Sequence, residues 1–95
     1  MANQIEGQVV SIDDSGNLIT DIAIDQLSAA PRDESVTIKF GDHATVGLFP
    51  ASHDQPDATM VAVLGNSGFL EIQIVGISLA EMLGIKVAES VAVSW

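Results

Sequence analysis

Hydrophobic and polar residues alternate along most of the chain, and a period of two is the pattern of half-buried β-strands. Residues 6–12 and 18–24 both alternate, and the five residues between them are the turn formers Asp, Asp, Ser, Gly and Asn. In the second segment Leu18, Thr20 and Ile22 fall on one face, with Ile19 and Asp21 on the other. The pattern predicts a β-hairpin at the start of the chain.

Five further segments are predicted to be strands, because they are short, rich in β-branched or aromatic residues and bounded by turn residues. Residues 60–64 are nearly all apolar, which indicates a strand buried on both faces. Segments 26–34 and 50–58 contain prolines and charged or amide side chains, and are predicted to be connections. The five predicted strands are residues 35–40, 43–49, 60–64, 69–75 and 91–95.

One short helix is predicted over residues 78–84. Ser78 is a typical N-cap residue, Glu81 is the third residue after it, and Gly84 ends the segment. Six or seven short strands with one helix describe an all-β domain, either a small antiparallel β-barrel or a sandwich. A chain of 95 residues can form one hydrophobic core, so we expect a single domain over residues 1–95.

The composition excludes several classes of partner and chemistry. There are 13 acidic and 3 basic residues, a formal net charge of −10, so neither nucleic acid nor an anionic membrane is expected to bind. The absence of cysteine excludes disulfides, thiolate metal sites and a cysteine nucleophile. Because neither a signal peptide nor a bilayer-spanning apolar stretch is visible, we expect a cytoplasmic protein.

The candidate catalytic and metal-binding side chains form no recognisable constellation. His43 and His53 lie ten residues apart, a spacing that matches no metal motif and suits two solvated histidines. Ser52, His53 and Asp54 are the residue types of a catalytic triad, but adjacent side chains point apart and cannot form its relay. The acidic residues of the first turn lack the oxygen spacing of a calcium loop. We expect no metal site, no cofactor and no catalytic residue.

Three polar or irregular segments remain as candidate ligand-binding elements. Asn17 follows Gly16 at the entry to a strand, and its carboxamide is both a donor and an acceptor. Residues 66–68 form a polar turn between two apolar strands, and residues 75–77 lie before the helix, where irregular backbone can offer free N–H and C=O groups. Each segment alone can be explained as an ordinary turn. A binding function requires that they meet at one rim of the barrel.

Two long motifs in this chain resemble the C-terminal domain of the S-adenosylmethionine hydroxide adenosyltransferase family, which also contains fluorinases and chlorinases. That domain opens with Gly-x-Val-x-x-Ile-Asp and then Phe-Gly-Asn-Leu-Ile-Thr-Asn-Ile; residues 7–13 fit the first motif, and residues 15–22 read Ser-Gly-Asn-Leu-Ile-Thr-Asp-Ile. Later the family has Asn-Ser-x-Gly-x-Leu-Glu-Ile, and residues 66–72 read Asn-Ser-Gly-Phe-Leu-Glu-Ile. The similarity extends over essentially the whole chain.

The resemblance implies a small antiparallel β-barrel of six to seven strands, and a role for particular residues. In the trimeric enzymes of the family this domain packs against the N-terminal domain of a neighbouring subunit, and the substrate binds at the junction. At the matching positions Asn17 would hydrogen-bond the nucleoside and Ser67 the methionine end. The backbone near Val75 and Ile77 would contact the adenine edge, and Phe49 would stack on adenine.

The departures from the family pattern shape the expected function. Ser15 replaces an aromatic residue, and Gly68 stands where halogenases have arginine, which agrees with the hydrolase branch. The family's catalytic N-terminal domain has no counterpart in these 95 residues. We therefore expect a stand-alone, non-catalytic binding or assembly module whose ligand is S-adenosylmethionine or adenosine. The alternatives are half of a split S-adenosylmethionine hydrolase that needs a separately encoded catalytic domain, and a self-associating homo-oligomeric domain without a ligand.

Overall fold

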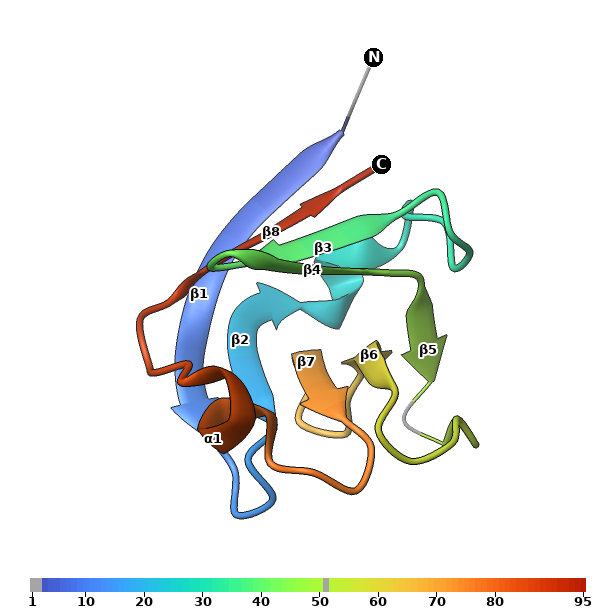
Figure 1. Cartoon of the computed structure of the whole chain (residues 1–95). Coiled ribbons are helices and arrows are strands. Elements are labelled where there is room, and N and C mark those ends of the chain that lie inside the picture. Colours follow the sequence, from blue (N-terminus) through green and yellow to red (C-terminus); the bar gives the residue numbers. More distant parts are fainter. Residues whose placement is uncertain (1–2, 51) are drawn as a thin grey trace.

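The computed structural model describes residues 3–50 and 52–95. It contains eight strands, one 3-10 helix and one α-helix (Figure 1). In chain order the elements are β1 (Gln4–Ile12), β2 (Leu18–Ala23), η1 (Ile24–Leu27), β3 (Thr37–Phe40), β4 (His43–Val46), β5 (Leu48–Pro50), β6 (Met60–Leu64), β7 (Phe69–Ile74), α1 (Leu79–Leu83) and β8 (Ser90–Ser94).

The strands form one sheet that curls into a nearly closed barrel. The strand order is β4-β3-β8-β1-β2-β7-β6-β5, so β4 and β5, which are consecutive in the chain, stand at opposite ends of it. The sheet must therefore curve until its two ends approach, as Figure 1 shows. At the approach, the Thr45 hydroxyl of β4 donates to the Met60 carbonyl oxygen of β6 over 3.2 Å. The predicted class, all-β with one short helix in a small barrel, is confirmed.

The prediction of a single strand over residues 43–49 is wrong, and this adds a strand to the predicted number. Gly47 has a φ of +87°, a conformation that ends a strand and that glycine adopts without strain. Its N–H donates to the Val36 carbonyl oxygen over 3.0 Å, one position beyond the last β3–β4 pair, Thr37 and Val46, and the pairing ends there. The chain then enters β5, which pairs with β6 in parallel, so the barrel is antiparallel except at this one pair.

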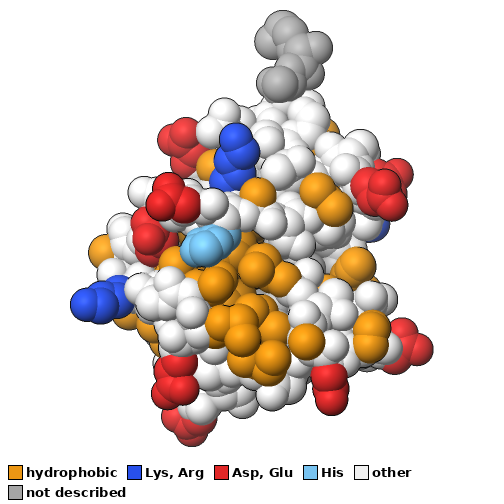
Figure 2. Space-filling view, viewed as in Figure 1, with side chains coloured by type: hydrophobic (Ala, Val, Ile, Leu, Met, Phe, Trp, Pro, Cys, Tyr) orange, Lys and Arg blue, Asp and Glu red, His pale blue; other side chains and the backbone are white. Residues whose placement is uncertain are grey.

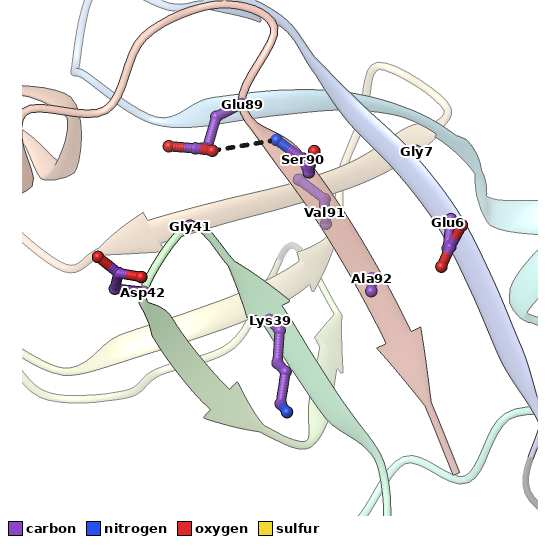
Figure 3. A pocket seen from close by; sticks show the side chains of 9 residues that line it. All are labelled: Glu6, Gly7, Lys39, Gly41, Asp42, Glu89, Ser90, Val91 and Ala92. Atoms are coloured by element: carbon purple, nitrogen blue, oxygen red, sulfur yellow. Dashed lines mark hydrogen bonds between the residues drawn. The ribbon is translucent and has the colours of Figure 1, made fainter.

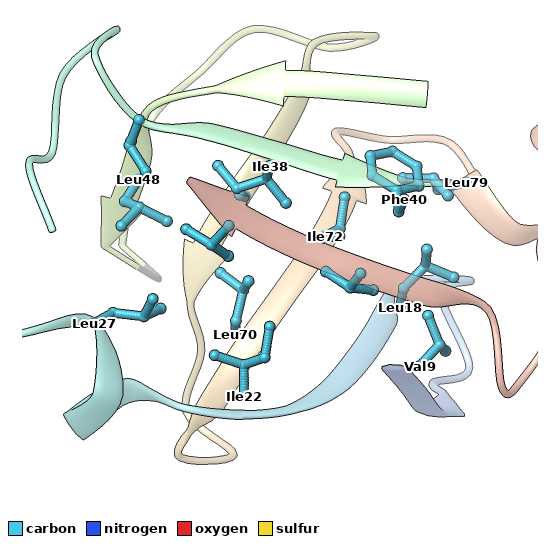
Figure 4. Close-up of a cluster of buried hydrophobic side chains, with 14 of the residues drawn as sticks. Val9, Leu18, Ile22, Leu27, Ile38, Phe40, Leu48, Leu70, Ile72 and Leu79 are labelled. Atoms are coloured by element: carbon cyan, nitrogen blue, oxygen red, sulfur yellow. The ribbon is translucent and has the colours of Figure 1, made fainter. Parts of the chain in front are cut away.

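The core lies inside the barrel and is built from the alternating positions of the strands (Figure 4). On β2 Leu18, Thr20 and Ile22 are buried while Asp21 is exposed, as the period of two predicts. The middle of β6 is buried on both faces, which confirms the prediction for residues 60–64. The largest fully buried side chains are Phe40, Leu18, Ile22, Leu27, Ile38, Leu70, Ile72 and Leu79.

Helix α1 forms where the sequence predicts it, because both of its ends are capped. The Ser78 hydroxyl accepts a hydrogen bond from the Glu81 N–H over 3.3 Å. Gly84 ends the helix in the left-handed conformation with a φ of +68°, and the Ile85 N–H donates back to the Ala80 carbonyl oxygen over 3.1 Å. None of the helices within the described residues has the length and apolarity needed to cross a membrane.

Thr20 is a buried polar residue at a point where the β2–β7 ladder is irregular. The pairing shifts register between Ile19 and Ala23, and the Thr20 hydroxyl compensates by donating to the Leu70 carbonyl oxygen over 2.8 Å. It also accepts from the Ile22 N–H over 3.2 Å. Thr20→Val keeps the shape but leaves both backbone groups unpaired, so we expect it to lower the free energy of unfolding by about 2 kcal/mol.

Urea denaturation of the purified variants measures this effect. Thr20→Ser is the matched control, because it retains the hydroxyl and loses only one buried methyl group, worth about 1 kcal/mol. A Thr20→Val variant that is as stable as the wild type would show that the hydroxyl does not repair the ladder.

Candidate functional site

The β1–β2 turn is held by the carboxylate of Asp13. One Asp13 oxygen accepts from the backbone N–H groups of Ser15 and Asn17, each over 2.9 Å, and the Gly16 N–H donates to the Asp13 carbonyl oxygen over 2.9 Å. Asn17 thus contributes only its backbone to the turn. Within the described residues its side-chain amide makes no hydrogen bond, so it is available to a ligand.

This turn is docked against the start of α1. The Gly16 carbonyl oxygen accepts from the Ala80 N–H over 3.0 Å, which satisfies one of the free donors of the first helical turn. Gly16 is buried, has a φ of +82°, and lies so close to Ser78 that a side chain would overlap it. The turn and the helix cap are therefore fixed relative to each other.

The segment between β7 and α1 forms the facing wall. The Val75 N–H donates to the Thr59 carbonyl oxygen over 3.0 Å, and the Val75 carbonyl oxygen accepts from the Ala58 N–H over 2.8 Å. The Ile77 N–H donates to the Ile74 carbonyl oxygen over 3.1 Å. The backbone groups of Val75 that the sequence suggested as free are thus already paired with the preceding loop.

An open cleft of about 410 Å³ lies between these two walls. Its polar lining consists of carboxamides and hydroxyl groups, its apolar lining of isoleucines, and no charged side chain lines it. Such a surface can hydrogen-bond an uncharged polar ligand and cover an apolar face of it, but it holds no general acid or base. The lining residues are Ser15, Asn17, Gln73, Ile74, Gly76, Ile77 and Ser78.

Gln73 is a lining residue that the sequence analysis did not select. It lies on β7 between buried Ile72 and Ile74, so its side chain faces the outside of the barrel. There it contacts His53, with 2.6 Å between the Nε2 atoms of the two side chains. The alternation along β7 predicts the outward direction of Gln73, but nothing local in the sequence indicates its partner.

A larger groove of about 480 Å³ crosses the outer face of β3, β8 and β1 (Figure 3). The register places Ala92 opposite both Glu6 and Lys39, so a small side chain separates a carboxylate from an ammonium group. Asp42 and Glu89 line the same groove. None of the three candidate ligand-binding segments borders it, and its side chains are mostly charged and exposed, so the cleft at Asn17 is the better candidate site.

On one face of the molecule the charged side chains lie around an apolar area. On the face seen in Figure 2 hydrophobic side chains gather at the centre, and carboxylates surround them. Within residues 3–50 and 52–95 no group of three or more histidine, aspartate or glutamate side chains is placed to hold a metal ion.

Comparison with known proteins decides the family. The family model described as the SAM hydroxide adenosyltransferase C-terminal domain matches residues 7–92. The chain belongs to this family. No curated protein sequence matches it.

Two solved structures are similar to this SAM hydroxide adenosyltransferase C-terminal domain. An uncharacterized conserved protein from Thermotoga maritima is 21% identical, with a TM-score of 0.76 over 95% of this chain. A conserved hypothetical protein from Thermus thermophilus is 29% identical, with a TM-score of 0.70 over 93% of this chain. The domain spans only 35% and 34% of those two chains, so each of them contains a further, larger part.

The fold of this C-terminal domain brings together only some of the residues that the resemblance assigned to a ligand. Asn17 and Ile77 line the same cleft, and Val75 adjoins it. Ser67 lies in the turn before the opposite end of β7, where the strand from Phe69 to Gln73 spans about 13 Å at the rise of an extended strand, and its hydroxyl donates to Glu71 over 2.8 Å. The expectation that all three segments share one rim is thus met by two of them.

The aromatic residue assigned to adenine stacking also lies outside the cleft lining. Phe49 is half-buried on β5, opposite Val63 in the parallel pair with β6. Its ring faces the His53 ring at a centroid distance of 6.2 Å and an angle of 45°. Since His53 in turn contacts Gln73, Phe49 reaches the cleft only through these two side chains.

Proposed function

We propose that this domain binds the nucleoside part of an adenosine-containing ligand in the cleft between the β1–β2 turn and the β7–α1 segment. The observation that carries the proposal is the free carboxamide of Asn17, held on a rigid turn at the edge of the cleft. A carboxamide can pair with the donor and acceptor that adenine presents side by side. The part-buried side chain of Ile77 supplies an apolar surface beside it.

The domain on its own is a binding module and not an enzyme. Hydrolysis of S-adenosylmethionine needs an activated water, and the cleft lining contains hydroxyl and amide groups but no side chain that would act as a base. A second candidate is that another domain completes the site, which the length of the similar chains favours. Activity that appears only when a catalytic domain of the family is added would support this second candidate.

Titration of the labelled domain with adenosine, followed by amide chemical shifts, tests the binding proposal. We expect adenosine to shift the signals of Gly16, Gly76 and the Asn17 side chain, with methionine alone leaving them unchanged, because the nucleoside is the part recognised in the cleft. Absence of any shift at millimolar adenosine would contradict the proposal.

Asn17→Ala separates the ligand role of this side chain from a structural one. We expect adenosine affinity to fall about tenfold, which corresponds to the loss of about one or two hydrogen bonds. The stability should change by less than about 0.5 kcal/mol, because Asp13 and not the Asn17 amide holds the turn. Ser67→Ala is the control: it removes a polar side chain of the family motif at the far end of β7 and should leave adenosine affinity unchanged.

A further inference from the structure

Asn17, which directly precedes β2, lies beside Gln73 of the neighbouring strand β7. Leu18 of β2 pairs with Ile72 of β7 in the antiparallel ladder, so the next residues outward along the two strands are Asn17 and Gln73. Both line the cleft. Two carboxamides therefore border the same opening, and the orientation of each decides whether it offers a donor or an acceptor.

The contacts of His53 fix the orientation of the Gln73 carboxamide. The Gln55 backbone N–H donates to Nδ1 of His53 over 3.2 Å, so Nδ1 is the unprotonated nitrogen of the neutral ring. Nε2 then carries the proton and donates it to Gln73. The 2.6 Å contact as placed joins two nitrogen atoms, and a proton on His53 Nε2 requires an acceptor. We therefore assign the Gln73 carboxamide turned by 180°, with its oxygen toward His53 and its NH₂ group directed away from it.

The position of His53 is fixed by its own contacts. Its backbone N–H donates to the Pro50 carbonyl oxygen over 3.0 Å, and its ring faces Phe49. The ring itself is held by the Gln55 N–H on Nδ1 and by the neighbouring Phe49 ring.

We infer that Gln73 is a specificity-determining residue of the cleft, and that His53 is its positioning residue. Gln73 binds a hydrogen-bond acceptor of the ligand through its NH₂ group, while the neighbouring Asn17 carboxamide supplies one donor and one acceptor. This inference rests on the proposed nucleoside binding and deepens it. The cleft thus selects a nucleobase with two features. One is a ring nitrogen or carbonyl oxygen that accepts a hydrogen bond from Gln73, and the other is a neighbouring donor and acceptor that pair with Asn17.

Isothermal titration with adenosine as the probe tests the role of Gln73. Gln73→Ala removes the side-chain NH₂ group and is expected to weaken binding about tenfold. Gln73→Glu is the sharper variant, because its carboxylate still accepts from His53 but cannot donate to a ligand; we expect a loss at least as large. Gln55→Ala is the matched control, since Gln55 contacts His53 through its backbone N–H alone.

A double-mutant cycle tests the positioning role of His53. His53→Ala is expected to weaken adenosine binding about threefold in the wild-type background and not at all in the Gln73→Ala background, because its effect passes through Gln73. The side-chain NH₂ resonances of Gln73 should move in His53→Ala even without ligand, and a merely structural role would not produce that coupled pattern.

The outcomes separate this inference from the proposed function. If the wild type binds no adenosine, both the nucleoside proposal and the Gln73 assignment are overturned. If the wild type and Gln73→Glu bind adenosine within twofold of each other, the cleft binds nucleosides but Gln73 does not select them. Equal losses from His53→Ala in both backgrounds would overturn the positioning role alone.

Discussion

Replacing Gly16 with alanine is expected to lower the free energy of unfolding by roughly 3 kcal/mol or more. A Cβ atom here would overlap the Ser78 hydroxyl and lie 2.6 Å from Ser78 Cβ and 2.7 Å from its Cα. The hydroxyl can rotate away, but the backbone of the helix cap cannot. The turn would have to move off α1, which breaks the 3.0 Å hydrogen bond from Ala80, and the positive φ of +82° adds strain.

Gly68→Ala is the matched control for this prediction. Gly68 has a similar φ of +89°, but no atom lies within 4 Å of the position that its Cβ would take. Alanine there should cost only the backbone strain, about 1–2 kcal/mol. Urea denaturation followed by the fluorescence of Trp95, the single tryptophan, measures both variants. Equal losses would show that the contact between the turn and the helix cap does not constrain the fold.

Features fixed by neighbouring residues could be predicted from the sequence. The β1–β2 turn follows from Asp13, whose side chain reaches backbone groups two and four residues later. The short helix follows from Ser78 and Gly84, which cap it locally. The buried faces of the strands follow from alternation, because a strand that covers a core has only one inward set of residues.

Features that depend on distant residues could not be predicted in this way. The contact between His53 and Gln73 spans 20 residues and requires the loop after β5 to fold over β6 and β7. Nothing in the sequence around Gly47 shows that the strand is interrupted there. The interruption depends on the curvature of the whole sheet, which places Gly47 at the junction of β4 and β5. The motif residue Ser67 is recognisable in the sequence, but only the direction of β7 shows that it lies far from Asn17.

Phe40→Ala is expected to lower the free energy of unfolding by about 4 kcal/mol. Phe40 is completely buried, and it pairs with Val91 on β8 and with His43 on β4, so its ring lies where two neighbouring strands meet the core. Removing it takes away the burial of an aromatic ring and leaves a cavity that the barrel cannot collapse to fill, since β3 is hydrogen-bonded on both sides.

Phe69→Ala removes the same atoms from a different environment and is the matched control. Phe69 begins β7 with 39% of its side chain exposed, so its loss leaves no closed cavity, and we expect a cost of about 1 kcal/mol. The difference between the two losses in free energy of unfolding, measured by urea denaturation, is therefore the cost of the cavity and not of the residue type. If the two variants lose equal stability, the interior of the barrel tolerates the void. The stability of the cleft walls would then depend on the turn contacts at Gly16 and not on the core behind them.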